Sequence, residues 1–263
     1  MVNFVGAGPG AVDLITVRGN RLLSEADVII YAGSLVNEEL LKVRKENSKV
    51  YNSAEMTLEQ VMEVIFEAER NNLMTVRLHT GDSSLYGAIK EQIDILEGNN
   101  ISYDICPGVS SFCAAAAALK TEYTLPDVSQ TVIITRMEGK TKVPDRERIE
   151  QLAKHQSAMV IFLSASMLDK LSQRLIEGGY SEDTAAAIVY KASWQDEKVI
   201  HCTVAQLYQK AQENNIKKTA LIIVGDFLDK SYSRSKLYDP SFETEFRKAE
   251  NSIGTDEKNN FFN

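Results

Sequence analysis

The first half of the chain alternates short apolar segments with amphipathic ones, beginning close to Met1. Val2–Val5 has the apolar character of a buried strand and leads directly into the loop Gly6–Gly10, GAGPG. A helical pattern follows at Val17–Ala26, with Thr16 as its predicted N-cap. Because strand, loop and helix recur in this order, we predict a largely parallel sheet with helices on both faces.

Further strands and helices of the first half follow from the same periodicities. The strands are expected at Val28–Tyr31, Met74–Leu78 and Tyr103–Cys106. The sequence Thr57-Leu-Glu-Gln60 is a capping box that predicts a helix through Val61, Ile65 and Ala68. Two more helices are expected at Tyr86–Leu96 and Phe112–Leu119.

The alternation breaks around Lys120–Asp127, where we place a domain boundary. We expect an N-terminal α/β domain with glycine-rich loops over residues 1–120, a C-terminal mixed α/β domain over 128–248 and a polar tail over 249–263. Second-half strands are expected at Val132–Thr135, Ala158–Leu163, Ala186–Tyr190, Val199–Thr203 and Leu221–Val224. Helices are expected at Asp145–Lys154, Ser166–Glu177 and Val204–Asn214. The fold class is therefore α/β, with two α/β domains.

Composition narrows the classes of function. The apolar fraction of 44% and charged fraction of 25% are those of a globular protein. A net charge of -8 argues against nucleic acid as a partner. Apolar runs are too short for a membrane span and no signal peptide is evident, so we expect a cytoplasmic protein without a membrane partner. The three cysteines and three histidines lack metal-ligand spacing, so no metal site is expected.

The loop Gly6–Gly10 fits a dinucleotide-binding fingerprint through Gly6, Gly8 and Ala11. Such a site needs a helix N-terminus beside the loop to hold the pyrophosphate. Here Pro9 removes one N–H donor, and the predicted helix waits until after Thr16. An NAD(P)-dependent oxidoreductase using this loop therefore stays an alternative at this stage.

Two other strand ends carry glycine-containing loops, in RLHTGDSSLYGA (residues 77–88) and CPGVSSFCAAAAALK (residues 106–120). Each alone is compatible with a capped helix and nothing more. Parallel strands, however, place their carboxyl ends at one edge of the sheet, where ligands bind. We therefore expect all three loops to meet at one site.

Taken in order, GAGPGAVDLIT, RLHTGDSSLYGA and PGVSSFCAAAAAL resemble the tetrapyrrole (corrin/porphyrin) methylase family, which uses S-adenosylmethionine. Second-half segments such as YKASWQDEKV (residues 190–199) and SKLYDPSF (residues 235–242) resemble its precorrin-4 C(11)-methyltransferase branch. The resemblance covers about residues 2–248. It implies a two-domain homodimeric methyltransferase of cobalamin biosynthesis, with the cofactor between the domains. Another ring position as the methylation site remains an alternative.

The resemblance also implies which residues line the cofactor site. They are Pro9, Thr80, Gly81, Asp82, Leu85, Ser110 and Ser111, with Leu163, Ala192 and Ala220 from the second domain. The substrate is a polycarboxylate tetrapyrrole, for which Tyr31, Ser34, Arg77, Arg136 and Lys191 are candidate contacts. Several relatives carry an Asp after the second strand where this chain has YAGSLV (residues 31–36), so we assign no catalytic base. Trp194, the only tryptophan, either stacks on the macrocycle or packs in a core or dimer interface. Between the two forms of the substrate, with and without cobalt, we favour the form that contains cobalt.

Overall fold

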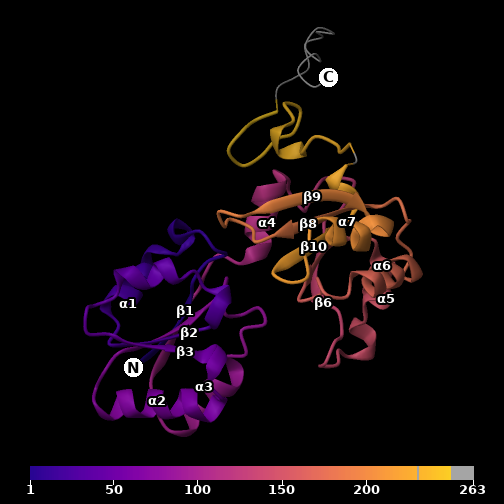
Figure 1. Ribbon diagram of the computed structural model, residues 1–263. Helices are drawn as coiled ribbons and strands as arrows, with labels where there is room; N and C mark the ends of the chain where they lie inside the picture. The colour runs from indigo at the N-terminus through magenta and orange to yellow at the C-terminus, as the bar shows by residue number, and fades with distance from the viewer. Residues whose placement is uncertain (230, 250–263) are drawn as a thin grey trace.

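Within residues 1–229 and 231–249, which the computed structural model describes (Ser34 by its backbone alone), ten strands form two five-stranded sheets (Figure 1). The first sheet contains β1 (Val2–Gly6), β2 (Val28–Tyr31), β3 (Lys49–Asn52), β4 (Thr75–His79) and β5 (Tyr103–Cys106) in the order β3-β2-β4-β1-β5. Every pair in this sheet is parallel, as predicted. Strand β3 was not predicted, because its four residues are exposed or half-buried and lack an apolar run.

Helices cover both faces of the first sheet, which confirms the predicted layering. Helix α1 (Val17–Glu25) packs Leu23 against one face, and α2 (Leu58–Arg70) and α3 (Lys90–Gly98) pack Ile65 and Leu96 against the other. The predicted caps are present: the Gly19 N–H donates to Thr16 Oγ1 (3.0 Å), and Thr57 and Gln60 form the capping box.

Helix α3 begins at Lys90 and not at the predicted Tyr86. Tyr86 and Ala88 have φ angles of 57° and 49°, which belong to the left-handed region. A right-handed helix cannot include such residues. Apolar spacing alone does not reveal this local turn.

The second sheet contains β6 (Val132–Arg136), β7 (Ala158–Phe162), β8 (Ala185–Tyr190), β9 (Lys198–Thr203) and β10 (Ala220–Val224) in the order β6-β7-β10-β8-β9. Strands β6 and β7 are parallel, and the other pairs are antiparallel, so this sheet is mixed. Helices α5 (Ile149–Leu152), α6 (Leu168–Glu177) and α7 (Leu207–Glu213) belong to this half. Leu171 of α6 and Leu207 of α7 pack with Ile188 and Ile222 on one face of the sheet.

The predicted helix Asp145–Lys154 is broken. Arg148 is extended (ψ 148°) and separates a short 3-10 turn, Asp145–Glu147, from the four-residue helix α5. Neighbouring helices also start later than predicted, α6 at Leu168 and α7 after a 3-10 turn at Val204–Gln206.

Helix α4 (Ser111–Leu119) joins the two halves. Its sequence lies within the predicted N-terminal domain, yet Ala114 and Ala115 pack with Val160 and Val189 of the second sheet. The predicted domain limits at residues 120, 128 and 248 stay predictions, and residues 250–263 of the predicted tail lie outside the described residues. Across the described ranges, every helix is too short or too polar to cross a membrane.

Candidate functional site

The three glycine-containing loops leave neighbouring strands of the first sheet. Strands β4, β1 and β5 are adjacent and parallel, so His79, Gly6 and Cys106 end side by side at one edge. This arrangement follows from the strand order and places the segments 7–11, 80–86 and 107–111 together. We call these segments loops 1, 2 and 3.

Loops 1 and 2 are joined through their backbones. The Gly81 N–H donates to the Gly8 carbonyl (2.8 Å), and the Gly8 N–H donates to the Gly81 carbonyl (3.2 Å). Both residues have positive φ angles, 79° for Gly8 and 59° for Gly81, which glycine adopts without steric cost. The two glycines therefore form a bridge between the loops, as their type in the sequence allows.

Asp82 joins loop 2 to loop 3. Its Oδ2 accepts a hydrogen bond from the Gly108 N–H (2.7 Å), and its Oδ1 accepts from the Ser84 N–H (2.9 Å) and from the Ser84 hydroxyl. Burial raises the pKa of Asp82, but the hydrogen bonds from Ser84 and Gly108 outweigh this effect and leave the pKa below its ordinary value. The carboxylate is therefore charged at neutral pH and holds both loops.

Loop 3 also approaches its neighbours too closely for any side chain at Gly108. A Cβ there would lie 2.2 Å from the Gly81 carbonyl oxygen and 2.7 Å from Gly6 Cα. These are backbone atoms and cannot move aside. The predicted meeting of the three loops is thus realised by direct backbone contact.

The second sheet turns a comparable edge toward these loops. Strands β6, β7 and β8 run in the same direction, so they end together at Arg136, Phe162 and Tyr190. Leu163 follows β7 with a φ of 53° and is 63% exposed. Ala192 follows β8, and Ala220 begins β10 where it pairs with Tyr190. The three second-half residues predicted for the cofactor therefore share one edge.

Two hydrogen bonds and one contact between aromatic rings connect the edges. Trp194 Nε1 donates to the Pro9 carbonyl (2.9 Å), and the Ala11 N–H donates to Ser193 Oγ (3.0 Å). The rings of Tyr86 in loop 2 and Phe162 at the end of β7 have centroids 5.4 Å apart. We call the facing edges, from loops 1–3 to Leu163, Lys191–Trp194 and Ala220, the junction.

Tyr31 is buried rather than presented to a ligand. Its side chain is 8% exposed and packs in the core under the first sheet, and its hydroxyl donates to Glu38 Oε1 (3.1 Å). Burial and then the neighbouring Glu38 raise the pKa of Tyr31. Ser34 lies in the 3-10 turn Gly33–Leu35, and its side chain lies outside the described residues.

Arg77 does not reach the junction, which corrects its prediction as a substrate contact. The side chain is 6% exposed, and burial lowers its pKa to about 10. It donates hydrogen bonds to Gln92 Oε1 (3.1 Å), the Ile30 carbonyl (2.9 Å) and Ser53 Oγ (3.1 Å). A buried guanidinium with its donors engaged in this way holds β2 and β4 to their surroundings. Arg77 was predicted as a contact because β4 leads directly into loop 2.

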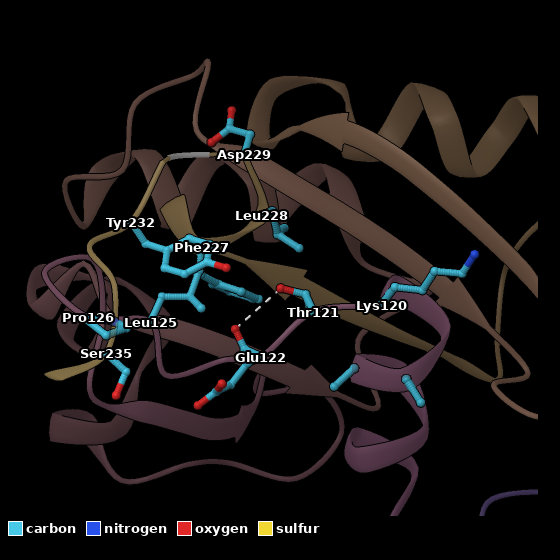
Figure 2. A pocket seen from close by; sticks show the side chains of 12 residues that line it. Lys120, Thr121, Glu122, Leu125, Pro126, Phe227, Leu228, Asp229, Tyr232 and Ser235 are labelled. Atoms are coloured by element: carbon cyan, nitrogen blue, oxygen red, sulfur yellow. Dashed lines mark hydrogen bonds between the residues drawn. The ribbon is translucent and has the colours of Figure 1, made fainter. Parts of the chain in front are cut away.

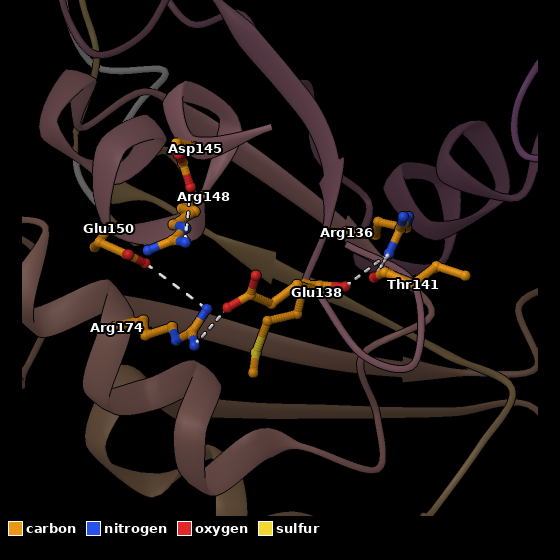
Figure 3. Close-up of polar contacts among 8 residues, drawn as sticks. Arg136, Glu138, Thr141, Asp145, Arg148, Glu150 and Arg174 are labelled. Atoms are coloured by element: carbon orange, nitrogen blue, oxygen red, sulfur yellow. Dashed lines mark hydrogen bonds and ion pairs between the residues drawn. The ribbon is translucent and has the colours of Figure 1, made fainter. Parts of the chain in front are cut away.

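Arg136 and Lys191 do lie at the second-sheet edge. Arg136 donates to the carbonyls of Thr141 (3.3 Å) and Lys142 (3.0 Å) and so closes the loop after β6 (Figure 3). In the same loop Glu138 pairs with Arg174 of α6 (2.8 Å), which lowers the pKa of Glu138. Lys191 Nζ pairs with Asp196 (2.6 Å).

A pocket of about 560 Å³ lies away from the junction, at the C-terminal end of α4 (Figure 2). Its apolar lining residues include Leu125, Phe227, Leu228 and Tyr232, and its charged ones include Lys120 and Asp229. It shares no lining residue with the predicted site. The three loops and this pocket are therefore separate features of the molecule.

The hydrogen bonds of loop 1 argue against a pyrophosphate cradle. The N–H groups of Ala7, Gly8 and Ala11 already donate to His79 O (2.7 Å), Gly81 O (3.2 Å) and Ser193 Oγ (3.0 Å). Helix α1 begins at Val17, well past the glycines, as predicted. A dinucleotide site uses free N–H groups at a helix N-terminus, which this loop does not offer.

Sequence reasoning did not identify Ser193, Gly10 or the contact of Trp194 with loop 1. Ser193 and Trp194 lie more than 180 positions from their partners in loop 1, 182 from Ala11 to Ser193 and 185 from Pro9 to Trp194. The only sequence signal for this contact was that Trp194, the single tryptophan, lies in the segment 190–199, which resembles the same family.

Comparison with known proteins agrees with the geometry. Residues 1–208 match the family of tetrapyrrole (corrin/porphyrin) methylases. A cobalt-precorrin-4 C(11)-methyltransferase of Methanocaldococcus jannaschii is 57% identical over 94% of this chain and 96% of its own. One of Priestia megaterium is 46% identical over 93% and 96%. The X-ray structure of a cobalt precorrin-4 methyltransferase superposes with a TM-score of 0.85 at 44% identity, over 87% of this chain and 96% of the other.

Proposed function

The chain belongs to the tetrapyrrole (corrin/porphyrin) methylase family, and from that premise we propose that it methylates cobalt-precorrin-4 at ring carbon 11, giving cobalt-precorrin-5. The observation that carries this proposal is 57% identity, across nearly the whole chain, to a relative named for that reaction. The names of both relatives and of the solved structure support the cobalt-containing substrate over the metal-free one. The family match leaves the oxidoreductase alternative without support.

We propose S-adenosylmethionine as the methyl donor and the junction as its site. The proposed contacts are Pro9, Thr80, Gly81, Asp82, Leu85, Ser110, Ser111, Leu163, Ala192 and Ala220. The junction fits such a donor because it combines closely joined backbone loops, the Asp82 carboxylate and an exposed apolar residue, Leu163, in a strained conformation. Strain of this kind is characteristic of functional sites.

When bound, S-adenosylmethionine supplies a methyl group on a positively charged sulfur, which a carbon nucleophile displaces in line. The residues of the junction have to hold the two reactants in the attack geometry and exclude water. Positioning of this kind lowers a barrier by roughly 7–11 kcal/mol. The charged Asp82 carboxylate favours a cationic donor at the same place. The electron-rich macrocycle is the nucleophile, so we assign no nucleophilic side chain and no general base.

The carboxylates of the tetrapyrrole require cations or hydrogen-bond donors. Arg136 and Lys191 stay proposed as substrate contacts because they lie at the junction, although each already has protein partners. Ser34 stays proposed, and Tyr31 is a weaker candidate because it is buried.

We also propose that the protein is a cytoplasmic homodimer. Large exposed side chains on the C-terminal segment, residues 231–249, support self-association: Tyr238 is 71% exposed and Phe246 is 89% exposed. In Figure 1 this yellow segment lies outside the second sheet, beyond β9. Sedimentation equilibrium tests the dimer; a monomer at every concentration would exclude it.

The activity is tested with purified protein, S-adenosylmethionine carrying a labelled methyl group and a panel of precorrin and cobalt-precorrin intermediates. We expect one labelled methyl at carbon 11 of cobalt-precorrin-4, located by NMR of the product. Methylation of an earlier intermediate but not of precorrin-4 or its cobalt form would contradict the assignment. Calorimetry with S-adenosylhomocysteine and NAD(P) is the control, and binding of NAD(P) alone would contradict the whole proposal.

A further inference from the structure

We propose that Trp194 is a positioning residue for donor binding. The turn Lys191–Glu197 of the second half holds loop 1 through Trp194 and Ser193 and thereby positions Pro9. We call these contacts the grip. The inference about the donor rests on the proposed function. The grip itself is a property of the chain alone and is testable without any ligand.

Three consecutive residues of loop 1 are held by side chains from outside the loop. Trp194 Nε1 donates to the Pro9 carbonyl (2.9 Å), and Asn37 Nδ2 donates to the Gly10 carbonyl (2.9 Å). The Ala11 N–H donates to Ser193 Oγ (3.0 Å). Two of the three contacts come from the second half of the chain.

Gly10 is needed for this grip. A Cβ at Gly10 would lie 2.1 Å from both Cδ1 and Nε1 of Trp194, well inside van der Waals contact. The indole therefore lies directly on the backbone of Gly10. In this loop the glycine makes room for a tryptophan and not for a phosphate group.

The turn that carries Trp194 is strained and strongly held. Lys191 and Ser193 have φ angles of 47° and 70°, which are uncommon for residues with a side chain. The Trp194 N–H donates to the Lys191 carbonyl (3.0 Å), and the Ser193 N–H donates to Glu197 Oε2 (2.6 Å). Lys191 Nζ lies 5.5 Å from the centroid of the Trp194 ring. Strain of this kind persists only where the surroundings impose it, and it concentrates at functional sites.

The grip connects directly to the proposed donor site. Pro9 has no N–H, so its carbonyl is the backbone group by which loop 1 can be anchored at that residue. The neighbouring Gly8 forms the bridge to Gly81, and Asp82 continues to Gly108. Pro9 follows Gly8, and Asp82 follows Gly81. A displacement of Pro9 is therefore transmitted to loops 2 and 3 through these hydrogen bonds.

The test removes the indole N–H while keeping a ring, with Trp194→Phe. We expect faster hydrogen exchange at the Ala11 amide in the ligand-free protein. S-adenosylhomocysteine should bind about 2- to 10-fold more weakly, the effect of one neutral hydrogen bond. The KM for the donor should rise more than kcat falls. Ser193→Ala should speed exchange at Ala11 without touching the indole, and Gly10→Ala should change both measurements in the same direction.

Tyr180→Phe is the matched control, because it also removes an aromatic donor to a backbone carbonyl, that of Ser157, inside the second half. It should lower stability and leave Ala11 exchange and donor affinity unchanged. Equal changes in Tyr180→Phe and Trp194→Phe would overturn the inference, as would unchanged Ala11 exchange in Trp194→Phe, Ser193→Ala and Gly10→Ala. If the wild type binds no S-adenosylhomocysteine, the proposed function fails, and the exchange measurement still decides the grip.

Discussion

Asp82 shows how much one side chain contributes to the junction. Its carboxylate bonds within loop 2 through Ser84 and across to loop 3 through Gly108. Hydrogen bonds to a charged group each contribute about 1.5–3 kcal/mol, more than neutral ones. The residue is thus a structural link between two loops as well as a candidate donor contact.

We expect Asp82→Ala to weaken S-adenosylhomocysteine binding and to lower the free energy of unfolding by roughly 1.5–3 kcal/mol while retaining the fold. Because the folded pKa of Asp82 is lowered, this stability is present above its ordinary pKa of 3.8 and is lost as pH falls through the folded value. Calorimetry and urea unfolding at several pH values measure both effects. Asp82→Asn keeps one acceptor oxygen and is the control; unchanged affinity in both variants would remove Asp82 from the site.

His79 lies at the end of β4 and is 4% exposed. Burial, and then the positive charge of Arg77, lower its pKa from 6.5 to about 3. The folded state therefore holds this imidazole neutral at physiological pH. Below pH 6.5 the unfolded chain binds a proton that the folded chain does not.

We therefore expect the wild type to lose stability, in the order of a few kcal/mol, as pH falls from about 6.5 toward 3. His79→Leu should lose less over the same range, because it has no proton to bind. The measurement is the difference in unfolding free energy between the two proteins at each pH. A difference that does not vary with pH would show that His79 titrates normally.

At the scale of elements, the junction depends on backbones that approach one another without side chains between them. Loop 3 passes Gly81 and Gly6 at Gly108 and then enters α4, which packs on the second sheet. The same short segment therefore connects loops 1 and 2 with the second half of the chain. A displacement of the backbone at Gly108 therefore affects the position of the loops and the packing of α4 on the second sheet.

We expect Gly108→Ala to lower the free energy of unfolding by about 1–3 kcal/mol or more, as overpacking does, and to weaken donor binding. Gly98→Ala is the matched control: its Cβ meets nothing within 4 Å, and it lies in α3. Alanine is favoured over glycine in a helix by about 0.5–1 kcal/mol, so Gly98→Ala should be neutral or stabilising. Thermal unfolding and calorimetry compare the two variants; a neutral Gly108→Ala would contradict the close packing of loop 3.

At the scale of the whole molecule, α4 connects the two sheets (Figure 1). Their facing edges are also joined by the contacts of Trp194 and Tyr86. A ligand bound by both edges stabilises the folded state of both halves together. Binding at about 100 times the dissociation constant contributes about 2.7 kcal/mol.

We therefore expect saturating S-adenosylhomocysteine to raise the melting temperature by roughly 5–10 °C in a single transition. NAD at the same concentration is the control and should leave it unchanged. Trp194 is the only tryptophan, so its fluorescence reports on the junction during the same experiment. A ligand-induced shift confined to one of two separate transitions would contradict a site shared by the halves.

Much of the fold followed from local sequence. The β1 run into Gly6, the Thr16 cap and the Thr57–Gln60 capping box lie where predicted, because each depends on neighbours within a few residues. The errors have a common cause. The left-handed Tyr86, the extended Arg148 and the half-exposed strand β3 leave no mark on the spacing of apolar residues, which was the signal used to predict them.

Sequence by itself determined the alternation of elements, three glycine-containing strand ends and, through them, the family. It identified loop 1 but not what the loop contacts. Tertiary structure decided that Arg77 is buried, that Asp82 holds Gly108 and that Gly10 lies beneath Trp194. The physical reason is distance along the chain: spacing within a loop reports backbone conformation, whereas the partner of Pro9 lies 185 residues away and is set only by packing of the two halves.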